Sequence, residues 1–203
     1  MSGIFIDASQ LRAIQAELGA TEVQYLAAYN KAVRQTSARL TKMSAALLMD
    51  VSGAKGAVRK RRVKSFVTKA NAGKGGGGKI WFGLDDIPVS SLNGSMKQPR
   101  KVARQRDQRG RFVKGRTGTR GATFTPRSER LSAMSFPGSF IGTIHGKRSI
   151  WIHNDSGFLT EAAVPVYPAM TSAIGKGLYS QAGEMLLDYF SKDLRGRIAG
   201  GVK

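Results

Sequence analysis

Residues 21–53 read TEVQYLAAYNKAVRQTSARLTKMSAALLMDVSG, and we expect this stretch to form the central helix of the fold. Thr21 and Gln24 stand three residues apart at its start, which is the spacing of a capping box. Behind them apolar residues recur near helical spacing as far as Gly53, and several alanines add helix propensity. The pattern predicts one helix of about 30 residues, longer than the average helix. The apolar residues at this spacing are Val23, Leu26, Val33, Leu40, Met43 and Leu47.

Two further helices are predicted, one on each side of the long one. Asp7 and Gln10 form another capping box, and the short helix behind them can end at Gly19. A C-terminal helix is predicted over residues 170–199. Its predicted buried stripe is Ile174, Leu178, Ala182, Met185, Leu186 and Tyr189.

Two β-hairpins are predicted between the helices. The first pairs residues 63–68 with 79–84 across four consecutive glycines, residues 75–78, which we expect to form a flexible tip. The second pairs residues 138–144 with 149–153. The predicted fold class is therefore α+β, with a long N-terminal helix and a C-terminal helix packed on a small antiparallel sheet of hairpins.

The charge of the chain is unevenly distributed. The formal net charge is +20, yet residues 1–50 carry 5 basic and 4 acidic side chains and residues 151–203 carry 5 of each. Residues 51–150 carry 23 basic and 4 acidic side chains. Such a concentration suggests a polyanionic partner or a strongly acidic protein surface.

About half of this excess lies in a segment with almost no apolar residues, so we expect one α+β domain over 1–203 with a basic, flexible, extended arm inserted at 95–130. A second basic patch lies in and after a short helix predicted over residues 54–62. The predicted partner- or phosphate-binding residues of the arm are Arg100, Lys101, Arg104, Arg106, Arg109, Arg111, Lys114, Arg116 and Arg120. The second basic patch consists of Arg59, Lys60, Arg61, Arg62 and Lys64.

Signals for catalysis are weak, and we predict no enzyme, no cofactor and no metal site. The chain has no cysteine, which removes thiol chemistry and thiolate ligands. Its two histidines, His145 and His153, flank one hairpin without a carboxylate pattern beside them. The glycine run 75–78 leads into an apolar strand rather than a helix, so it does not match a phosphate-binding loop.

The order of these features resembles a known family. A long alanine-rich helix (21–51) runs into a basic stretch (58–63), then a strand and an arm. Phe-Ile-Gly-Thr-Ile (140–144) turns into Ile-Trp-Ile (150–152), and Val-Pro-Val-Tyr-Pro (164–168) leads to a final helix. This arrangement resembles the minor tail protein Z family of tailed bacteriophages, the lambda-type tail completion proteins.

The resemblance implies a non-enzymatic virion protein of the tail or neck, assembled in the host cytoplasm. It would act at the head-proximal end of the tail, in head–tail joining and DNA positioning. The implied partners are further copies in a ring with six-fold symmetry, the tail terminator and connector, and the genomic DNA end. No membrane partner is expected, because no apolar run in the sequence is long enough to cross a bilayer.

The residues themselves leave an alternative open, a sequence-independent nucleic-acid-binding protein acting through its basic arm. They also leave open whether the arm contacts DNA or an acidic protein surface.

Overall fold

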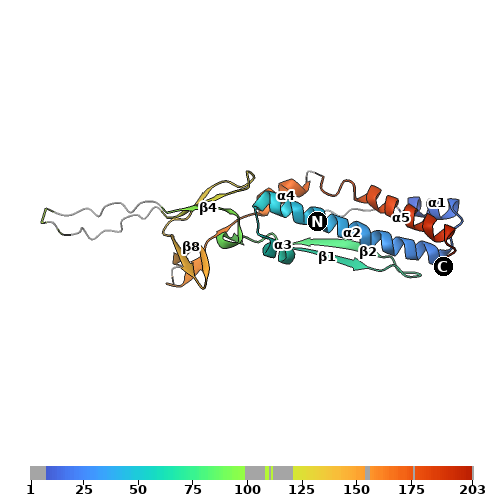
Figure 1. Cartoon of the computed structure of the whole chain (residues 1–203), viewed down its shortest axis with the longest axis horizontal. Helices are drawn as coiled ribbons and strands as arrows, with labels where there is room; N and C mark the ends of the chain where they lie inside the picture. The colour runs from blue at the N-terminus through green and yellow to red at the C-terminus, as the bar shows by residue number, and fades with distance from the viewer. Residues whose placement is uncertain are drawn as a thin grey trace. The chain divides into compact units, whose positions relative to one another are not determined.

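A computed structural model describes residues 8–98, 108–109, 111, 121–153, 156–175 and 177–202 of the chain. The helices are α1 (Ala8–Glu17), α2 (Glu22–Ser52), α3 (Gly56–Arg62), α4 (Tyr167–Gly175) and α5 (Ala182–Ala199), with a 3-10 turn η1 (Val89–Ser91). The strands are β1 (Val63–Thr68), β2 (Gly77–Phe82), β3 (Ile87–Pro88), β4 (Gly94–Lys97), β5 (Thr123–Pro126), β6 (Met134–Ser135), β7 (Phe140–Ile144), β8 (Lys147–His153), β9 (Leu159–Glu161) and β10 (Ala163–Val164). Within the described residues they form four small antiparallel sheets, in the orders β1-β2, β10-β3, β4-β5-β6 and β7-β8-β9 (Figure 1). The predicted α+β class is confirmed.

The chain divides into two compact units. The first comprises Met1–Leu47, Arg59–Gly83 and Ser172–Lys203, and the second comprises Leu48–Val58 and Leu84–Thr171. The arm is therefore inserted in the second unit. The expectation of one domain over 1–203 stays a prediction.

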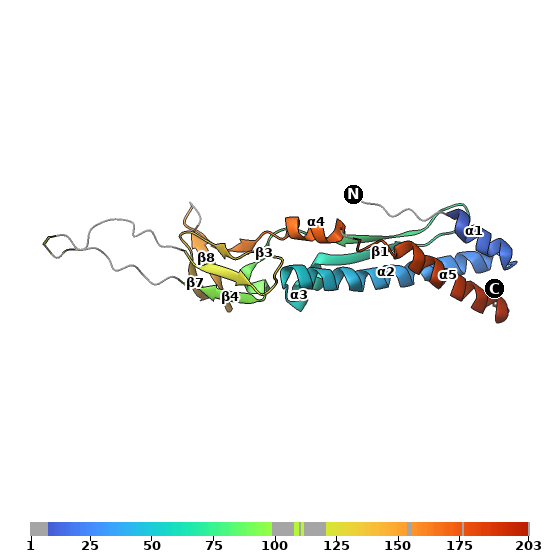
Figure 2. The same cartoon turned by 90° about the horizontal axis from the view of Figure 1, so that it is seen from above.

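The core of the first unit is built where α1, α2 and α5 meet, as two views of the ribbon show (Figures 1 and 2). Thr21 and Gln24 form the predicted capping box: the Gln24 amide donates to Thr21 Oγ1 at 3.3 Å, and the Thr21 amide donates to Gln24 Oε1 at 3.0 Å. The buried cluster consists of Leu11, Tyr25, Ala28, Ala32, Val33, Leu186, Phe190 and Leu194. The rings of Tyr25 and Phe190 meet edge to face, with centroids 5.4 Å apart.

The hairpin β1–β2 lies along α2 in both views. Its register pairs Val63 with Phe82 and Thr68 with Gly77, close to the pairing that the sequence predicts. Side-chain hydrogen bonds from α2 hold the tip: the Tyr29 hydroxyl donates to the Gly76 carbonyl at 2.9 Å, and the Asn30 side chain bonds both the amide and the carbonyl of Ala70. The tip is thus tied to the helix by polar contacts.

The single C-terminal helix predicted over residues 170–199 is wrong. The structure has two helices, α4 and α5, and between them Gly177 has a φ of +103°, a left-handed conformation that a regular α-helix cannot include. Two glycines, Gly175 and Gly177, lie at this break, and both weaken a helix. In α5 the buried residues are Ala182, Leu186, Phe190 and Leu194.

The second unit contains the hairpin predicted from the Phe-Ile-Gly-Thr-Ile motif. Strands β7 and β8 pair from Phe140↔Trp151 to Ile144↔Lys147. Their turn is shorter than expected and consists of His145 and Gly146, both at positive φ, as a type I′ hairpin turn requires. Strand β9 adds to the other edge of β8.

Candidate partner-binding surfaces

Strands β4 and β5 form the root of the basic arm. They pair antiparallel from Gly94↔Pro126 to Lys97↔Thr123. The predicted arm, residues 95–130, is therefore wrong at both ends, because each end contains a strand of a regular sheet. The sequence signal was weak since each strand has only four residues and its partner lies far along the chain. The pairing brings the two ends of the arm side by side.

The carboxyl-side end of the arm is buried and hydrogen-bonded. Ala122 and Phe124 have almost no exposed surface. The Ala122 amide donates to Ser139 Oγ at 2.9 Å, and the Phe136 amide donates to the Ala122 carbonyl at 2.9 Å. At the other end, the Ile141 amide donates to Gln98 Oε1 at 2.8 Å. The described residues on either side of the arm are therefore both held by hydrogen bonds within the second unit.

Gly121 shows how closely the root is packed. A Cβ atom at this position would lie 1.5 Å from the carbonyl oxygen of Phe136, which is backbone and cannot rotate away. Only glycine fits there without a shift of the chain.

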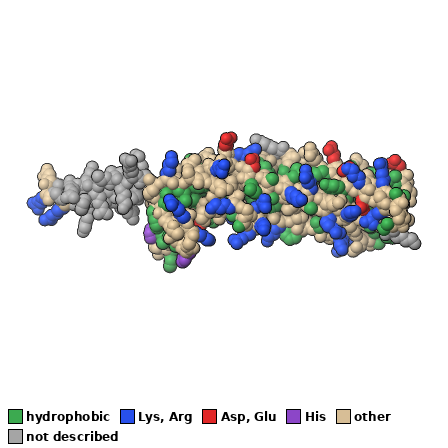
Figure 3. Space-filling model, viewed as in Figure 1, with side chains coloured by type: hydrophobic (Ala, Val, Ile, Leu, Met, Phe, Trp, Pro, Cys, Tyr) green, Lys and Arg blue, Asp and Glu red, His purple; other side chains and the backbone are tan. Residues whose placement is uncertain are grey.

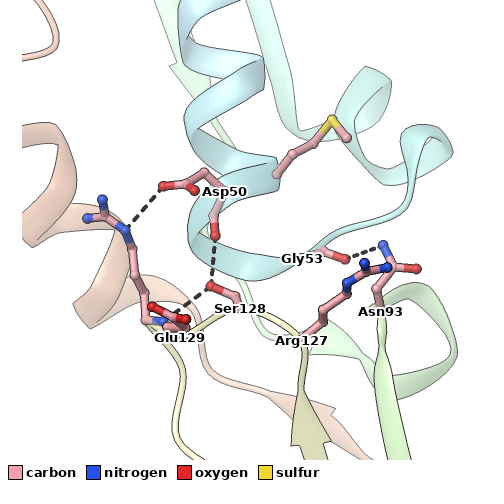
Figure 4. A pocket seen from close by; sticks show the side chains of 8 residues that line it. Asp50, Gly53, Asn93, Arg127, Ser128 and Glu129 are labelled. Carbon is pink, nitrogen blue, oxygen red and sulfur yellow. Dashed lines mark hydrogen bonds and ion pairs between the residues drawn. The ribbon is translucent and has the colours of Figure 1, made fainter.

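An open pocket of about 490 Å³ lies at the end of α2 within the second unit (Figure 4). The Ser128 hydroxyl oxygen lies 2.7 Å from the carbonyl oxygens of both Asp50 and Val51, which share its single proton. The Asn93 side-chain amide donates to the Gly53 carbonyl at 2.9 Å. The residues lining the pocket are Met49, Asp50, Gly53, Asn93, Arg127, Ser128, Glu129 and Arg130.

These contacts satisfy carbonyl groups that the last turn of a helix leaves without intrahelical partners. Arg130 Nε also lies 3.1 Å from a carboxylate oxygen of Asp50, in an exposed ion pair. Since Arg127 and Ser128 directly follow β5, the pocket joins the arm root to the end of α2. Its polar groups serve structure, and it holds no histidine.

Two of the predicted arm residues are described, and both are exposed: Arg109 and Arg111. The others lie outside the described residues. They are Arg100, Lys101, Arg104, Arg106, Lys114, Arg116 and Arg120.

The second basic patch separates into two kinds of residue. Arg59 and Arg62 are half-buried, and a terminal nitrogen of Arg62 donates to the Gly83 carbonyl at 3.2 Å. Lys60, Arg61 and Lys64 are exposed. Arg62 thus helps to close the base of the β1–β2 hairpin, and the exposed cations are available to a partner. Lysine and arginine side chains are spread over the visible face, where acidic side chains are few (Figure 3).

Sequence reasoning missed two exposed aromatic side chains beside this patch. Phe66 of β1 is 55% exposed and Trp81 of β2 is 41% exposed. The signal was present as an alternation, because Lys64 precedes Phe66 by two residues and Lys79 precedes Trp81 by two residues. Residues two apart in a strand share a face.

Sequence reasoning also missed Glu161, a half-buried carboxylate of β9. Burial raises its pKa, but hydrogen bonds from the Ser149 hydroxyl at 2.6 Å and from the Ser90 amide at 2.8 Å outweigh it, so the net pKa is lowered. The carboxylate therefore stays ionised and connects β8 and η1. Its role is structural.

The histidines lie apart from any metal-binding arrangement. His145 forms the β7–β8 turn, and His153 Nδ1 lies 3.5 Å from the Gly157 carbonyl oxygen. Among the residues that the structure describes, no group of three or more His, Asp and Glu side chains could hold a metal ion. Nor does any described helix combine the length and apolar content that a bilayer crossing requires.

Comparisons with protein-family models, with curated proteins and with solved structures give no match for this chain. Its function is therefore inferred from its residues and their geometry.

Proposed function

We propose that this chain is a structural protein of a bacteriophage virion, a tail completion or neck component at the head-proximal end of the tail. One observation carries the proposal: a long cationic segment starts and ends on the paired strands β4 and β5, whose buried root is fixed in the second unit. A protein that joins two assemblies needs a folded body for one contact and an extended element for the other. The order of elements that resembles the tail completion family supports the same role.

The mode of action follows from charge and packing. The folded parts supply contacts between copies and with the tail terminator or connector. The arm reaches an acidic neighbour or the phosphates of the DNA end, because arginine and lysine side chains gain free energy from releasing counterions there. A ring with six-fold symmetry needs heterologous contacts that close on themselves. Such a ring would place six arms around one channel.

The test uses tails assembled without this chain. We expect the purified chain to bind one end of these tails in negative-stain images and to restore joining to DNA-filled heads. The matched variant replaces residues 100–120 with Asn-Gly, which keeps Gln98, Gly121 and the β4–β5 pairing and closes the hairpin with a favoured turn. This variant should fold and should fail in joining. Monomers that ignore tails would overturn the proposal.

The charge distribution favours one second candidate, a sequence-independent nucleic-acid-binding protein. Residues 51–150 carry 23 basic and 4 acidic side chains. This candidate predicts tight duplex binding at low salt, with a steep salt dependence that the same 100–120 replacement removes. Weak duplex binding together with tail binding favours the virion protein.

A further inference from the structure

The outer face of the β1–β2 hairpin carries two aromatic rings and two lysines in an alternating pattern. Lys64 is paired directly with Trp81, and Phe66 is paired directly with Lys79. Paired residues of antiparallel strands project from the same face of the sheet, and so do residues two apart along one strand. The four side chains therefore share one face. Gly78, whose place for a side chain is filled by Ser37 of α2, belongs to the opposite face.

Both rings on this face are accessible. Phe66 and Trp81 are diagonal neighbours, a relationship that separates residues by about 7–8 Å in an antiparallel pair. Lys64 Nζ lies 5.7 Å from the centroid of the Trp81 ring, within the range of a cation–π contact. Lys79 is exposed beside them. The face thus offers flat apolar surface and positive charge together.

The Trp81 ring is positioned by its neighbours Gly83 and Arg62. A Cβ atom on Gly83 would lie 2.7 Å from Trp81 Cη2 and 3.1 Å from Arg62 Cδ, so the indole lies over a glycine and beside the arginine stem. Arg62 is itself fixed by its bond to the Gly83 carbonyl. A ring that is already positioned loses little conformational freedom when a ligand stacks on it.

We propose that this face binds single-stranded nucleic acid, with bases stacked on Phe66 and Trp81 and phosphates beside Lys64 and Lys79. Base stacking on aromatic side chains beside a basic surface is the general physical basis of single-strand recognition. Duplex DNA fits less well because its bases are already stacked on one another. A second copy of the chain fits less well because lysines would meet lysines in a protein of net charge +20.

This inference is independent of the tail proposal and concerns a different surface from the arm. Between Arg104 and Arg120 the sequence contains one aromatic residue, Phe112, so the arm offers phosphate contacts with almost no stacking. The hairpin face supplies the stacking that the arm lacks. The diagnostic quantity is therefore the ratio of single-strand to duplex affinity, to which the arm contributes little.

The experiment uses the full chain and an oligothymidylate of about 15 nucleotides, a length in the range of single-strand binding sites. Affinity for it and for a duplex of equal length is measured by fluorescence anisotropy across a series of salt concentrations. F66A/W81A should weaken oligothymidylate binding by about 30-fold or more, because each of the two stacked rings contributes about 1–3 kcal/mol, and duplex binding should stay unchanged. The logarithm of the binding constant falls linearly with the logarithm of the salt concentration. K64Q/K79Q should make this slope less steep by about 0.7 for each phosphate that a lysine no longer neutralises.

Two further variants keep the result decisive if the alanine variant folds poorly. F66Y/W81F retains both rings and should bind like the wild type, whereas F66L/W81L retains apolar area without aromatic faces and should bind like the alanine variant. V67A is the matched control, since Val67 is an exposed apolar residue of the same strand on the opposite face. It should leave binding unchanged.

Unchanged oligothymidylate affinity in F66A/W81A overturns the proposal, as does an equal loss for oligothymidylate and duplex. Full binding by F66L/W81L also overturns it, because the contact would then be apolar rather than stacked. Polyglutamate serves as the competing polyanion. If its binding depends on the two rings as strongly as that of oligothymidylate, the face recognises an acidic protein instead.

Discussion

Gly78 of β2 lies so close to Ser37 of α2 that a Cβ atom on the glycine would fall 2.2 Å from the serine hydroxyl oxygen. Ser37 is buried in the face of α2 that the hairpin covers. The glycine run 75–78 therefore has, at this position, a packing role: it lets a strand approach a helix without an intervening side chain.

We predict that Gly78→Ala destabilises the protein by about 1–3 kcal/mol, the usual cost of overpacking a close contact. Gly77→Ala is the matched control, because a Cβ atom there meets nothing within 4 Å. Adding Ser37→Ala to Gly78→Ala should restore most of the lost stability, since it removes the clashing oxygen. Urea unfolding of the wild type, Gly78→Ala, Ser37→Ala and the double variant forms a double-mutant cycle, and the absence of coupling would contradict the contact.

The hydroxyl of Ser128 serves the end of α2, and Ser128→Ala should cost about 1–2 kcal/mol because two helix carbonyls lose their partner. Arg130→Gln should cost less than about 1 kcal/mol, because its ion pair with Asp50 is exposed on both sides. Ser132→Ala, at an exposed position, is the control. Thermal unfolding ranks the three variants. A larger loss for Arg130→Gln than for Ser128→Ala would show that the ion pair, rather than the capping hydroxyl, holds this junction.

Local signals predicted much of the fold. The capping box of Thr21 and Gln24 forms with both reciprocal bonds, and β1 occupies the predicted residues 63–68. These features depend on residues near one another in sequence. The division of the C-terminal helix was missed because the periodicity of its apolar residues outweighed two glycines, although Gly177 adopts a conformation that ends a helix.

The apolar spacing of α2 matches its buried face only in part. Val33 and Leu40 are buried, but Val23 is 62% exposed. The sequence prediction followed large apolar residues, whereas the structure also buries Thr36, Ser37 and Ser44 on this helix. At Ser37 a small side chain matters because Gly78 of the hairpin approaches closely, and this requirement comes from a segment about 40 residues away in the chain.

The candidate surfaces show the same contrast between features that nearby residues predict and features that depend on distant residues. Exposed cations such as Lys60 and Lys64 could be predicted from composition, because charged residues are read directly from the sequence, without knowledge of their neighbours in space. The arm root could not, since the pairing of β4 with β5 joins residues on either side of the whole arm. The aromatic face was missed although its alternation is present within each strand, because only the register of the two strands, with Lys64 opposite Trp81, brings both rings onto one face.

Two glycines inside α5 offer a gain in stability. A Cβ atom on Gly183 or Gly196 meets nothing within 4 Å, and neither residue has a positive φ. Replacing each with alanine should stabilise the protein by about 0.5–1 kcal/mol, because glycine loses more backbone entropy than alanine in a helix. Differential scanning calorimetry should show a higher Tm for both variants. A lower Tm would mean that an added methyl group clashes with its surroundings at these positions.

Asp193 of α5 should make stability depend on pH. Its side chain is only 10% exposed, and its carboxylate accepts hydrogen bonds from Lys31 of α2 and, at 2.7 Å, from Arg197. Burial raises its pKa, but these two cationic donors lower it further, so the folded-state pKa lies below the ordinary value. The stabilisation is therefore present above about pH 4, the ordinary aspartate range, and is lost as the pH falls through the folded-state pKa.

Asp193→Asn should cost about 2 kcal/mol near pH 7, as expected for the loss of hydrogen bonds between charged groups. The difference from the wild type should shrink toward pH 3, because the wild-type carboxylate then becomes protonated as well. Asp188→Asn is the control, since the Asp188–Lys192 pair on the same helix is exposed and contributes little. Urea unfolding of the three proteins between pH 3 and pH 7 measures the effect. A cost for Asp193→Asn that is constant over this range would show that the ionised carboxylate contributes no stability here.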